Sequence, residues 1–130
     1  MSRNVEPMFS KIDAMDVEGF LSNLAENVTF QFGNAPALVG RAAVREGVVA
    51  FFSSIAALRH EMTGKWEADD ITILRFMTYY TRHDRIEVEV PCAVILHHAE
   101  DTLIDDYRIY IDLAPVFAPH LRDKQAAATH

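Results

Sequence analysis

The fold of this chain is decided by the stretch Leu103-Ile104-Asp105-Asp106-Tyr107-Arg108-Ile109-Tyr110-Ile111-Asp112. Its content of β-branched and aromatic residues predicts a strand. Side chains alternate along a strand, so Tyr110 and Asp112 share one face. Tyr107, Ile109 and Ile111 share the opposite face, and both faces need cover. We therefore expect one face to line a small-molecule pocket and the other to meet a partner subunit.

The composition is that of one globular domain over residues 1–130, with a flexible tail expected at 122–130. Half of the residues are hydrophobic and 24% are charged, as in ordinary soluble domains. The formal net charge of −7 argues against a nucleic-acid partner, because phosphate binding needs clustered Lys and Arg. The single cysteine, Cys92, cannot form an internal disulfide, and no apolar run reaches the ~18 residues of a membrane span. We therefore expect a cytoplasmic protein that binds neither nucleic acid nor membranes.

The patterns along the chain are helical first and extended afterwards. Apolar residues recur at helical spacing after Pro7, after Asp16 and over Ala42–Leu58, which predicts three helices. Alternating stretches predict a strand at Val28–Phe32 and four more over 60–68, 71–83, 86–98 and 103–112. The fold class we expect is α+β, with the helices packed on one side of a curved, mostly antiparallel sheet.

The turn at Asp84-Arg85 sets the register of the hairpin formed by the two longest strands. Alternate residues from Val88 to Leu96 are uniformly apolar, so their face belongs under the helices. If the turn has two residues, Met77 and Tyr79 share this inner face with Val90.

The last hairpin allows two registers. A three-residue loop at Glu100-Asp101-Thr102 places Tyr110 and Asp112 inward. A four-residue loop places Ile109 and Ile111 inward and expels Asp112. One residue of slip moves every side chain to the opposite face, and turn chemistry alone leaves both registers open.

Three stretches carry a family resemblance. They are the predicted helix and strand over 16–30, the loop Phe32-Gly33-Asn34-Ala35-Pro36-Ala37-Leu38-Val39-Gly40-Arg41, and the closing strand Tyr107-Arg108-Ile109-Tyr110-Ile111-Asp112. In this order they resemble the nuclear transport factor 2-like superfamily, especially its SnoaL-like and limonene-epoxide-hydrolase-like branches. The resemblance covers about residues 8–117. It implies a cone-shaped sheet wrapped around three N-terminal helices, an apolar pocket inside the cone, and homodimers formed through the outer sheet face.

The resemblance also implies that Asp112 points into the pocket, which favours the three-residue loop. Tyr107, Ile109 and Ile111 would then lie outside, where an apolar patch suits a dimer interface. In the epoxide hydrolases the matching aspartate is the general base that activates water. From the residues alone, Asp112 could equally end the strand and cap the segment after it.

Asn34 matches an asparagine that helps to position the catalytic water in the epoxide hydrolases, although Gly33-Asn34-Ala35-Pro36 is also typical of a turn. Phe32 stands where that branch carries a tyrosine. Arg82 and Asp84 resemble the Arg-x-Asp pair of the same enzymes, but they lie at a predicted hairpin tip instead of inside a strand. The acid that would protonate an epoxide oxygen is therefore missing, which disfavours epoxide hydrolysis.

The candidate catalytic residues are thus Asp112, Tyr110, His60 and Asn34. His60 can act as an acid or a base near neutral pH, although a histidine at the start of a strand is often only a satisfied polar residue. We expect the substrate to contact mostly apolar side chains, namely Phe32, Met62, Trp66, Met77, Tyr79 and Val90.

We expect no metal and no cofactor, since His97-His98 cannot share one face of a strand and Cys92 lies in an apolar strand. Together with these residues, the resemblance implies a cofactor-free acid–base enzyme (an isomerase, cyclase, dehydratase or hydrolase) that acts on a small apolar or polyketide-like molecule, with Asp112 as general base. Tyr110, Tyr79 or His60 would stabilise charge on oxygen. The alternative is a non-catalytic module of the same fold that binds a small molecule or a protein partner.

Overall fold

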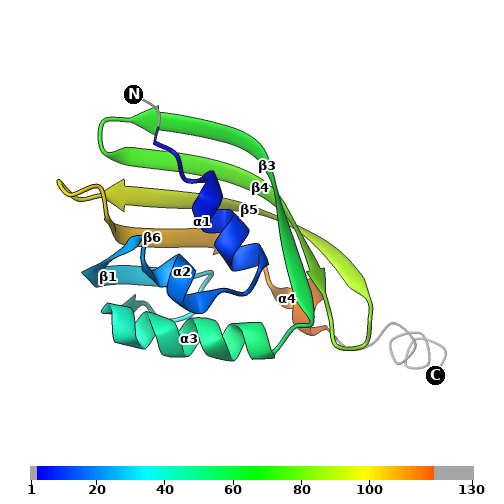
Figure 1. Cartoon of the computed structure of the whole chain (residues 1–130). Helices are drawn as coiled ribbons and strands as arrows, with labels where there is room; N and C mark the ends of the chain where they lie inside the picture. The colour runs from blue at the N-terminus through cyan, green and yellow to red at the C-terminus, as the bar shows by residue number, and fades with distance from the viewer. Residues whose placement is uncertain (1–2, 119–130) are drawn as a thin grey trace, which may run out of the picture.

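Six strands form one curved, unclosed sheet in the computed structural model, which describes residues 3–118 (Figure 1). The elements in chain order are α1 (Glu6–Asp13), α2 (Val17–Leu21), β1 (Leu24–Phe32), β2 (Leu38–Val39), α3 (Arg41–Ser53), β3 (Ala57–Ala68), β4 (Ile71–Thr81), β5 (Glu87–His98), β6 (Ile104–Ile111) and α4 (Ala114–Phe117). The strand order across the sheet is β2-β1-β6-β5-β4-β3. Adjacent strands are antiparallel except β1 and β6. The predicted α+β class is confirmed.

Helices α1, α2 and α3 lie against one face of the sheet, and their apolar stripes explain why (Figure 1). Phe9 and Ile12 of α1 are buried, as are Val44 and Val48 of α3. Two helices, α2 and α3, end earlier in the sequence than predicted. The chain is already in β1 at Leu24, and the long helix ends at Ser53, because the following residues pair with β4 instead of continuing the helix.

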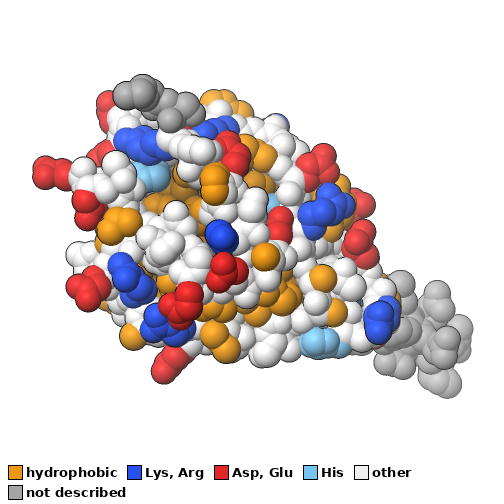
Figure 2. All heavy atoms as spheres, viewed as in Figure 1, with side chains coloured by type: hydrophobic (Ala, Val, Ile, Leu, Met, Phe, Trp, Pro, Cys, Tyr) orange, Lys and Arg blue, Asp and Glu red, His pale blue; other side chains and the backbone are white. Residues whose placement is uncertain are grey.

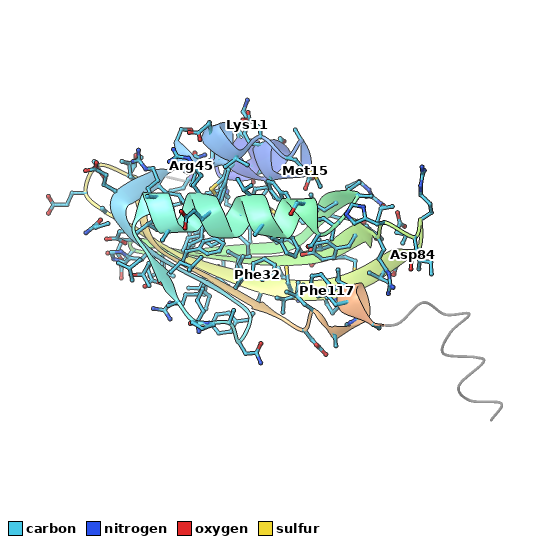
Figure 3. The ribbon with its side chains drawn as sticks, turned by 90° about the horizontal axis from the view of Figure 1, so that it is seen from below. Lys11, Met15, Phe32, Arg45, Asp84 and Phe117 are labelled. Atoms are coloured by element: carbon cyan, nitrogen blue, oxygen red, sulfur yellow. The ribbon has the colours of Figure 1, made fainter. Side chains whose placement is uncertain are left out.

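The register predicted for the β4–β5 hairpin is wrong by one residue. Its loop has three residues instead of two, because Arg82 and Ile86 still pair, with 2.9 Å between Arg82 N and Ile86 O. Arg85 has φ of 72°, the left-handed conformation that ends such three-residue loops. Strand β4 therefore turns its other face to the helices, and Met77 and Tyr79 point outward. Asp84 marks the loop at the far end of the sheet (Figure 3).

A β-bulge reverses the face of β6. The loop after β5 is the predicted three-residue one, since Ala99 N donates to Leu103 O at 2.8 Å. Between His97 and His98, however, the pairing shifts by one residue, so that Asp105 is an extra residue in β6. The predicted inward orientation of Tyr110 and Asp112 is therefore wrong.

Beyond the bulge, β6 presents to the helices the face that we had assigned to the dimer. Tyr107 pairs with Leu96 and Ile109 with Val94 on the inner face. Tyr107 is 1% exposed, whereas Tyr110 is 57% exposed. The predicted outer position of Tyr107, Ile109 and Ile111 is therefore wrong as well.

His97 contacts the bulged residue Asp105 and also Asp70. Its Nδ1 lies 2.5 Å from Asp105 Oδ1 and its Nε2 lies 2.7 Å from Asp70 Oδ2. Both partners are carboxylates, which only accept, so both ring nitrogens donate only when the imidazole is protonated. The hydrogen bond to Asp105, followed by that to Asp70, raises the pKa of His97 above its ordinary value. The hydrogen bond between His97 and Asp70 also lowers the pKa of Asp70 below its ordinary value.

These shifts predict a pH-dependent contribution to stability. His97 binds its proton more tightly in the folded state, so its contribution is complete below its ordinary pKa of 6.5 and is lost as pH rises through the folded pKa. Asp70 contributes above its ordinary pKa of 3.8 and loses its part as pH falls through its own lowered pKa. We expect the variant His97→Gln to lower the melting temperature more at pH 5.5 than at pH 9. Equal losses at the two pH values in thermal melts would contradict the bridging role.

The expected flexible tail at 122–130 lies outside the described residues. Within residues 3–118, none of the helices combines the length and the apolar character that crossing a membrane requires.

Candidate active site

A cavity of about 360 Å³ lies between the helices and the inner face of the sheet. This is within the range of small-molecule sites, ~300–1,000 Å³. Its lining is mostly apolar and consists of Phe9, Ile12, Phe20, Phe30, Phe32, Ala35, Pro36, Leu38, Gly47, Val48, Phe51, Phe52, Leu58, His60, Tyr80, Cys92, Val94, Tyr107 and Ile109. Hydrophobic side chains are visible on this face of the molecule between α1 and α3 (Figure 2). Ala35 and Pro36 are exposed, so the loop between β1 and β2 forms part of the rim.

Aromatic rings form the wall beneath α3. The ring centroids of Phe32 and Phe51 are 4.8 Å apart, and the ring of Phe117 lies edge-on to Phe51 at 6.4 Å. Phe32 and Phe117 lie on the same side of α3 (Figure 3). Phe32 was predicted to contact substrate, and it lines the cavity.

His60, a polar side chain of the cavity lining, forms a pair with Asp13 behind it. His60 Nδ1 lies 2.6 Å from Asp13 Oδ1, and the backbone N of His60 donates to Asp13 Oδ2 at 3.1 Å. Both carboxylate oxygens are thus held by one residue of β3. The His60 side chain is only 10% exposed, whereas that of Asp13 is 27% exposed.

The fold brings these two residues together across 47 positions of sequence. His60 pairs with Thr78 of β4, and its ring packs against Phe9 and Phe76 at centroid distances of 5.3 and 5.1 Å. Asp13 is the last residue of α1. A carboxylate at the C-terminal end of a helix is unfavourable for the helix dipole, and the bonds from His60 offset this cost.

The pair selects one tautomer of the neutral imidazole. A carboxylate accepts, so Nδ1 carries the proton and Nε2 presents its lone pair. Within residues 3–118, Nε2 has no hydrogen-bond partner. An oriented imidazole with a free lone pair, in a mostly apolar cavity, can take a proton from a bound molecule and return it.

Two tyrosines and the cysteine are the other polar groups of the lining. Tyr80 and Tyr107 are 2% and 1% exposed, and Cys92 is 7% exposed. Burial, and secondarily the neighbouring Cys92 thiol, raises the pKa of both tyrosines well above the usual range. Burial also raises the pKa of Cys92. All three groups are therefore neutral near pH 7, and Cys92 has the properties of a core thiol instead of a nucleophile.

Of the predicted catalytic residues, His60 alone lines the cavity. Asp112 is exposed, and its Oδ1 accepts a hydrogen bond, at 3.0 Å, from the backbone N of Ala114, the first residue of the short helix α4. Asn34 is an exposed turn residue. Tyr110 projects from the outer face. Asp112 therefore lies at the end of its strand and Asn34 in a turn, as the alternative interpretations of these two residues predicted.

The predicted substrate contacts divide in the same way. Val90 and Met62 belong to the inner face, although they do not line the cavity. Three residues were predicted to point inward but lie outside the cavity, namely Trp66, Met77 and Tyr79. Trp66 is 51% exposed because a bulge between Met62 and Gly64 shifts the register of β3. The Tyr79 hydroxyl donates to Glu61 Oε2 at 3.0 Å on the outer face.

Sequence reasoning missed Asp13, Tyr80 and Tyr107. The available signal for Asp13 was its negative charge, since an acidic residue in the last turn of a helix is unfavourable without a compensating partner. Tyr80 and Tyr107 were assigned to the outer face by the register errors of β4 and β6. Within the described part of the chain, no group of three His, Cys, Asp or Glu side chains has the arrangement of a metal site.

Comparison with known proteins agrees with this architecture. The family model of the SnoaL-like domain matches residues 5–107. No curated protein matches the chain. An NTF2-like protein of unknown function from Burkholderia pseudomallei has a similar structure, with a TM-score of 0.80 and 16% identity over 88% of this chain and 95% of that chain.

Two further solved structures are similar in fold. A protein proposed to be a polyketide cyclase, from Xanthomonas campestris, gives a TM-score of 0.73 at 17% identity, over 88% of this chain and 91% of that chain. The epoxide hydrolase/cyclase-like enzyme SalBIII, which takes part in pyran ring formation in the polyether salinomycin, gives 0.74 at 19% identity, over 85% and 88%. Identities this low establish the fold alone. Because the family model spans most of the chain, this protein belongs to the SnoaL-like family, within the nuclear transport factor 2-like superfamily.

Proposed function

We propose that this protein is a cofactor-free acid–base enzyme in which His60 moves a proton on a small apolar molecule held in the cavity. The observation that carries the proposal is the Asp13–His60 pair, whose Nδ1–Oδ1 distance is 2.6 Å and whose free nitrogen belongs to a cavity-lining residue. His60 replaces Asp112 as the general base, because Asp112 lies outside the cavity.

The proposed step is removal of a proton from a carbon next to a carbonyl group. His60 Nε2 accepts the proton, and the electron pair of the C–H bond moves toward the carbonyl oxygen to give an enolate. Asp13 holds the imidazole in place and stabilises the imidazolium that forms. Return of the proton to another carbon gives an isomerase, whereas its delivery to a leaving hydroxyl gives a dehydratase. If the enolate carbon instead attacks a second carbonyl of the same molecule, a carbon–carbon bond closes the ring, the resulting alkoxide takes the proton back from His60, and the result is a cyclase.

The lining supports a neutral, mostly apolar substrate. Six phenylalanines contribute to it, and a buried charge without a partner would be costly there. The cyclase-type relatives support a polyketide-like or polyether-like molecule as the natural substrate. Among the reactions open to His60, we favour ring closure or dehydration of such a molecule.

Proton abstraction can be tested before the natural substrate is known. Neutral aryl ketones, beginning with α-tetralone, are incubated with the protein in deuterium oxide, and loss of the α-proton signal is followed by nuclear magnetic resonance. We expect exchange faster than in buffer alone. Binding of the ketone without faster exchange would overturn the proposal and favour the non-catalytic binding module.

The homodimer remains our prediction, with a corrected interface. Trp66, Ile73 and Tyr110 are large hydrophobic side chains exposed on the outer face at 51%, 37% and 57%, and such a patch favours association. We expect size-exclusion chromatography with light scattering to give twice the monomer mass, and Ile73→Lys to give the monomer. Val39→Lys, at a 68% exposed position on the edge strand β2, is the matched control. A wild-type monomer would refute the prediction.

A further inference from the structure

We propose that Leu38 and Gly47 determine how bulky a ligand the cavity admits, because their contact sets the width of its mouth. The mouth is the gap framed by Ala35, Pro36 and Leu38 on one side and by Gly47 of α3 on the other. This inference deepens the proposed function and rests on it only in taking the cavity as the ligand site. It assigns to these two residues selection of the ligand by size, separate from proton transfer.

The exposure of the lining residues locates the mouth. Ala35 and Pro36 line the cavity and are exposed, so a ligand can pass from solvent beside them. Leu38 and Gly47 also line the cavity and are half-buried. Helix α3 contacts both β1 and β2, and the loop between these strands therefore faces the middle of α3 across the gap.

Gly47 leaves the room that the end of the Leu38 side chain occupies. A Cβ atom added to Gly47 would lie 2.6 Å from Leu38 Cδ1, well inside the preferred separation of two carbon atoms. Glycine is unfavourable in the interior of a helix, and Gly47 lies in the middle of α3. The contact with Leu38 gives a physical reason for glycine at this position.

The backbone of Leu38 is held in place, whereas its side chain can turn. Leu38 pairs with Phe30 of β1, and the backbone N of Gly40 donates to Val28 O at 2.8 Å. Directly paired residues point to the same face of a sheet, so the Leu38 side chain stays on the inner face with Phe30. A methyl group added at Gly47 therefore turns the end of this side chain across the mouth instead of moving the strand.

The test compares a wide hydrocarbon, tetralin, with a narrow one, toluene. Dissociation constants of both are measured by titration, followed by nuclear magnetic resonance, for the wild type and for Gly47→Ala. We expect Gly47→Ala to bind tetralin about fivefold or more weakly, the effect of one methyl group too many in a packed site, and to lose less affinity for toluene. Alanine favours a helix more than glycine, so the melting temperature should not fall, and a weakened α3 cannot explain the loss.

A double variant shows whether Leu38 is the group that Gly47→Ala displaces. Leu38→Ala/Gly47→Ala should bind tetralin as tightly as Leu38→Ala does, because the coupling between the two positions is lost with the leucine side chain. Leu38→Ala alone should raise the association and dissociation rates of tetralin, which are read from the exchange broadening of the resonances. Val49→Ala is the matched control on α3, since Val49 is 49% exposed and lies outside the lining. It should leave both affinities unchanged.

Four results would overturn the inference. They are an unchanged tetralin affinity in Gly47→Ala, equal losses of tetralin and toluene, a weaker binding of tetralin by the double variant than by Leu38→Ala, and failure of the wild type to bind either hydrocarbon. Neither compound carries a carbonyl group, so the outcome does not depend on His60. If α-tetralone binds but its α-protons do not exchange, the proposed reaction is wrong and the size selection at the mouth stands.

Discussion

Replacing His60 with glutamine is expected to lower the rate of enzyme-catalysed α-proton exchange by about 10²-fold or more, the usual contribution of a positioned general base. Glutamine keeps much of the volume of histidine and can still donate to Asp13, but it cannot accept a proton from carbon. The loss should therefore appear in the rate at saturating ketone and not in the affinity for it. Exchange of α-tetralone in deuterium oxide, measured as a function of ketone concentration, separates these two quantities.

Asp13→Asn and His83→Gln complete this experiment. The asparagine variant replaces one acceptor by a donor and so disturbs the tautomer of His60. We therefore expect a loss of at least about tenfold in the exchange rate. His83→Gln changes an exposed histidine at the β4–β5 loop and should exchange protons at the wild-type rate. Wild-type exchange in His60→Gln would show that another group removes the proton.

Leu74→Ala is expected to lower the free energy of unfolding by about 2–5 kcal/mol, the cost of removing a fully buried leucine side chain. Leu74 is 0% exposed on the inner face of β4, whereas its neighbour Ile73 is 37% exposed on the outer face. Ile73→Ala should therefore cost about 1 kcal/mol or less. Urea unfolding followed by circular dichroism measures both variants.

This pair of variants also tests the register of β4. The two-residue turn predicted from sequence would bury Ile73 and expose Leu74, so it reverses the order of the two losses. Any part of the Ile73 effect that comes from a dimer should grow with protein concentration, whereas the Leu74 effect should not. A larger loss in Ile73→Ala at every concentration would contradict the structure.

Local patterns sufficed to predict the class and order of the elements. The uniformly apolar alternation from Val88 to Leu96 identified the inner face of β5 correctly. The faces of the neighbouring strands depend instead on single residues of register. One extra loop residue ahead of Ile86 reversed β4, and the bulge at Asp105 reversed β6 although its three-residue loop was predicted correctly. A bulge is stabilised by contacts such as His97–Asp105, which alternation along one strand cannot indicate.

The candidate site could be predicted only in part for the same reason. Phe32 was recognised through the family resemblance, and His60 because it precedes the bulge of β3, where the predicted alternation still holds. Asp13 was not, because its role depends on the docking of α1 on β3, a tertiary contact. The family resemblance drew attention to Asp112, and here that residue is exposed and accepts a hydrogen bond from the backbone of Ala114. A shared fold places a cavity, but it does not determine which residue supplies the base.

The bond between Asp13 and His60 has a consequence for how activity depends on local stability. Its carboxylate is carried by α1, a helix of eight residues, and helices this short are marginal without tertiary packing. Partial opening that frees an N-terminal helix while the sheet stays folded costs less free energy than global unfolding. The imidazole would then keep its place on β3 but lose the group that orients it. We therefore expect heating to abolish the proposed catalysis at a lower temperature than it unfolds the sheet.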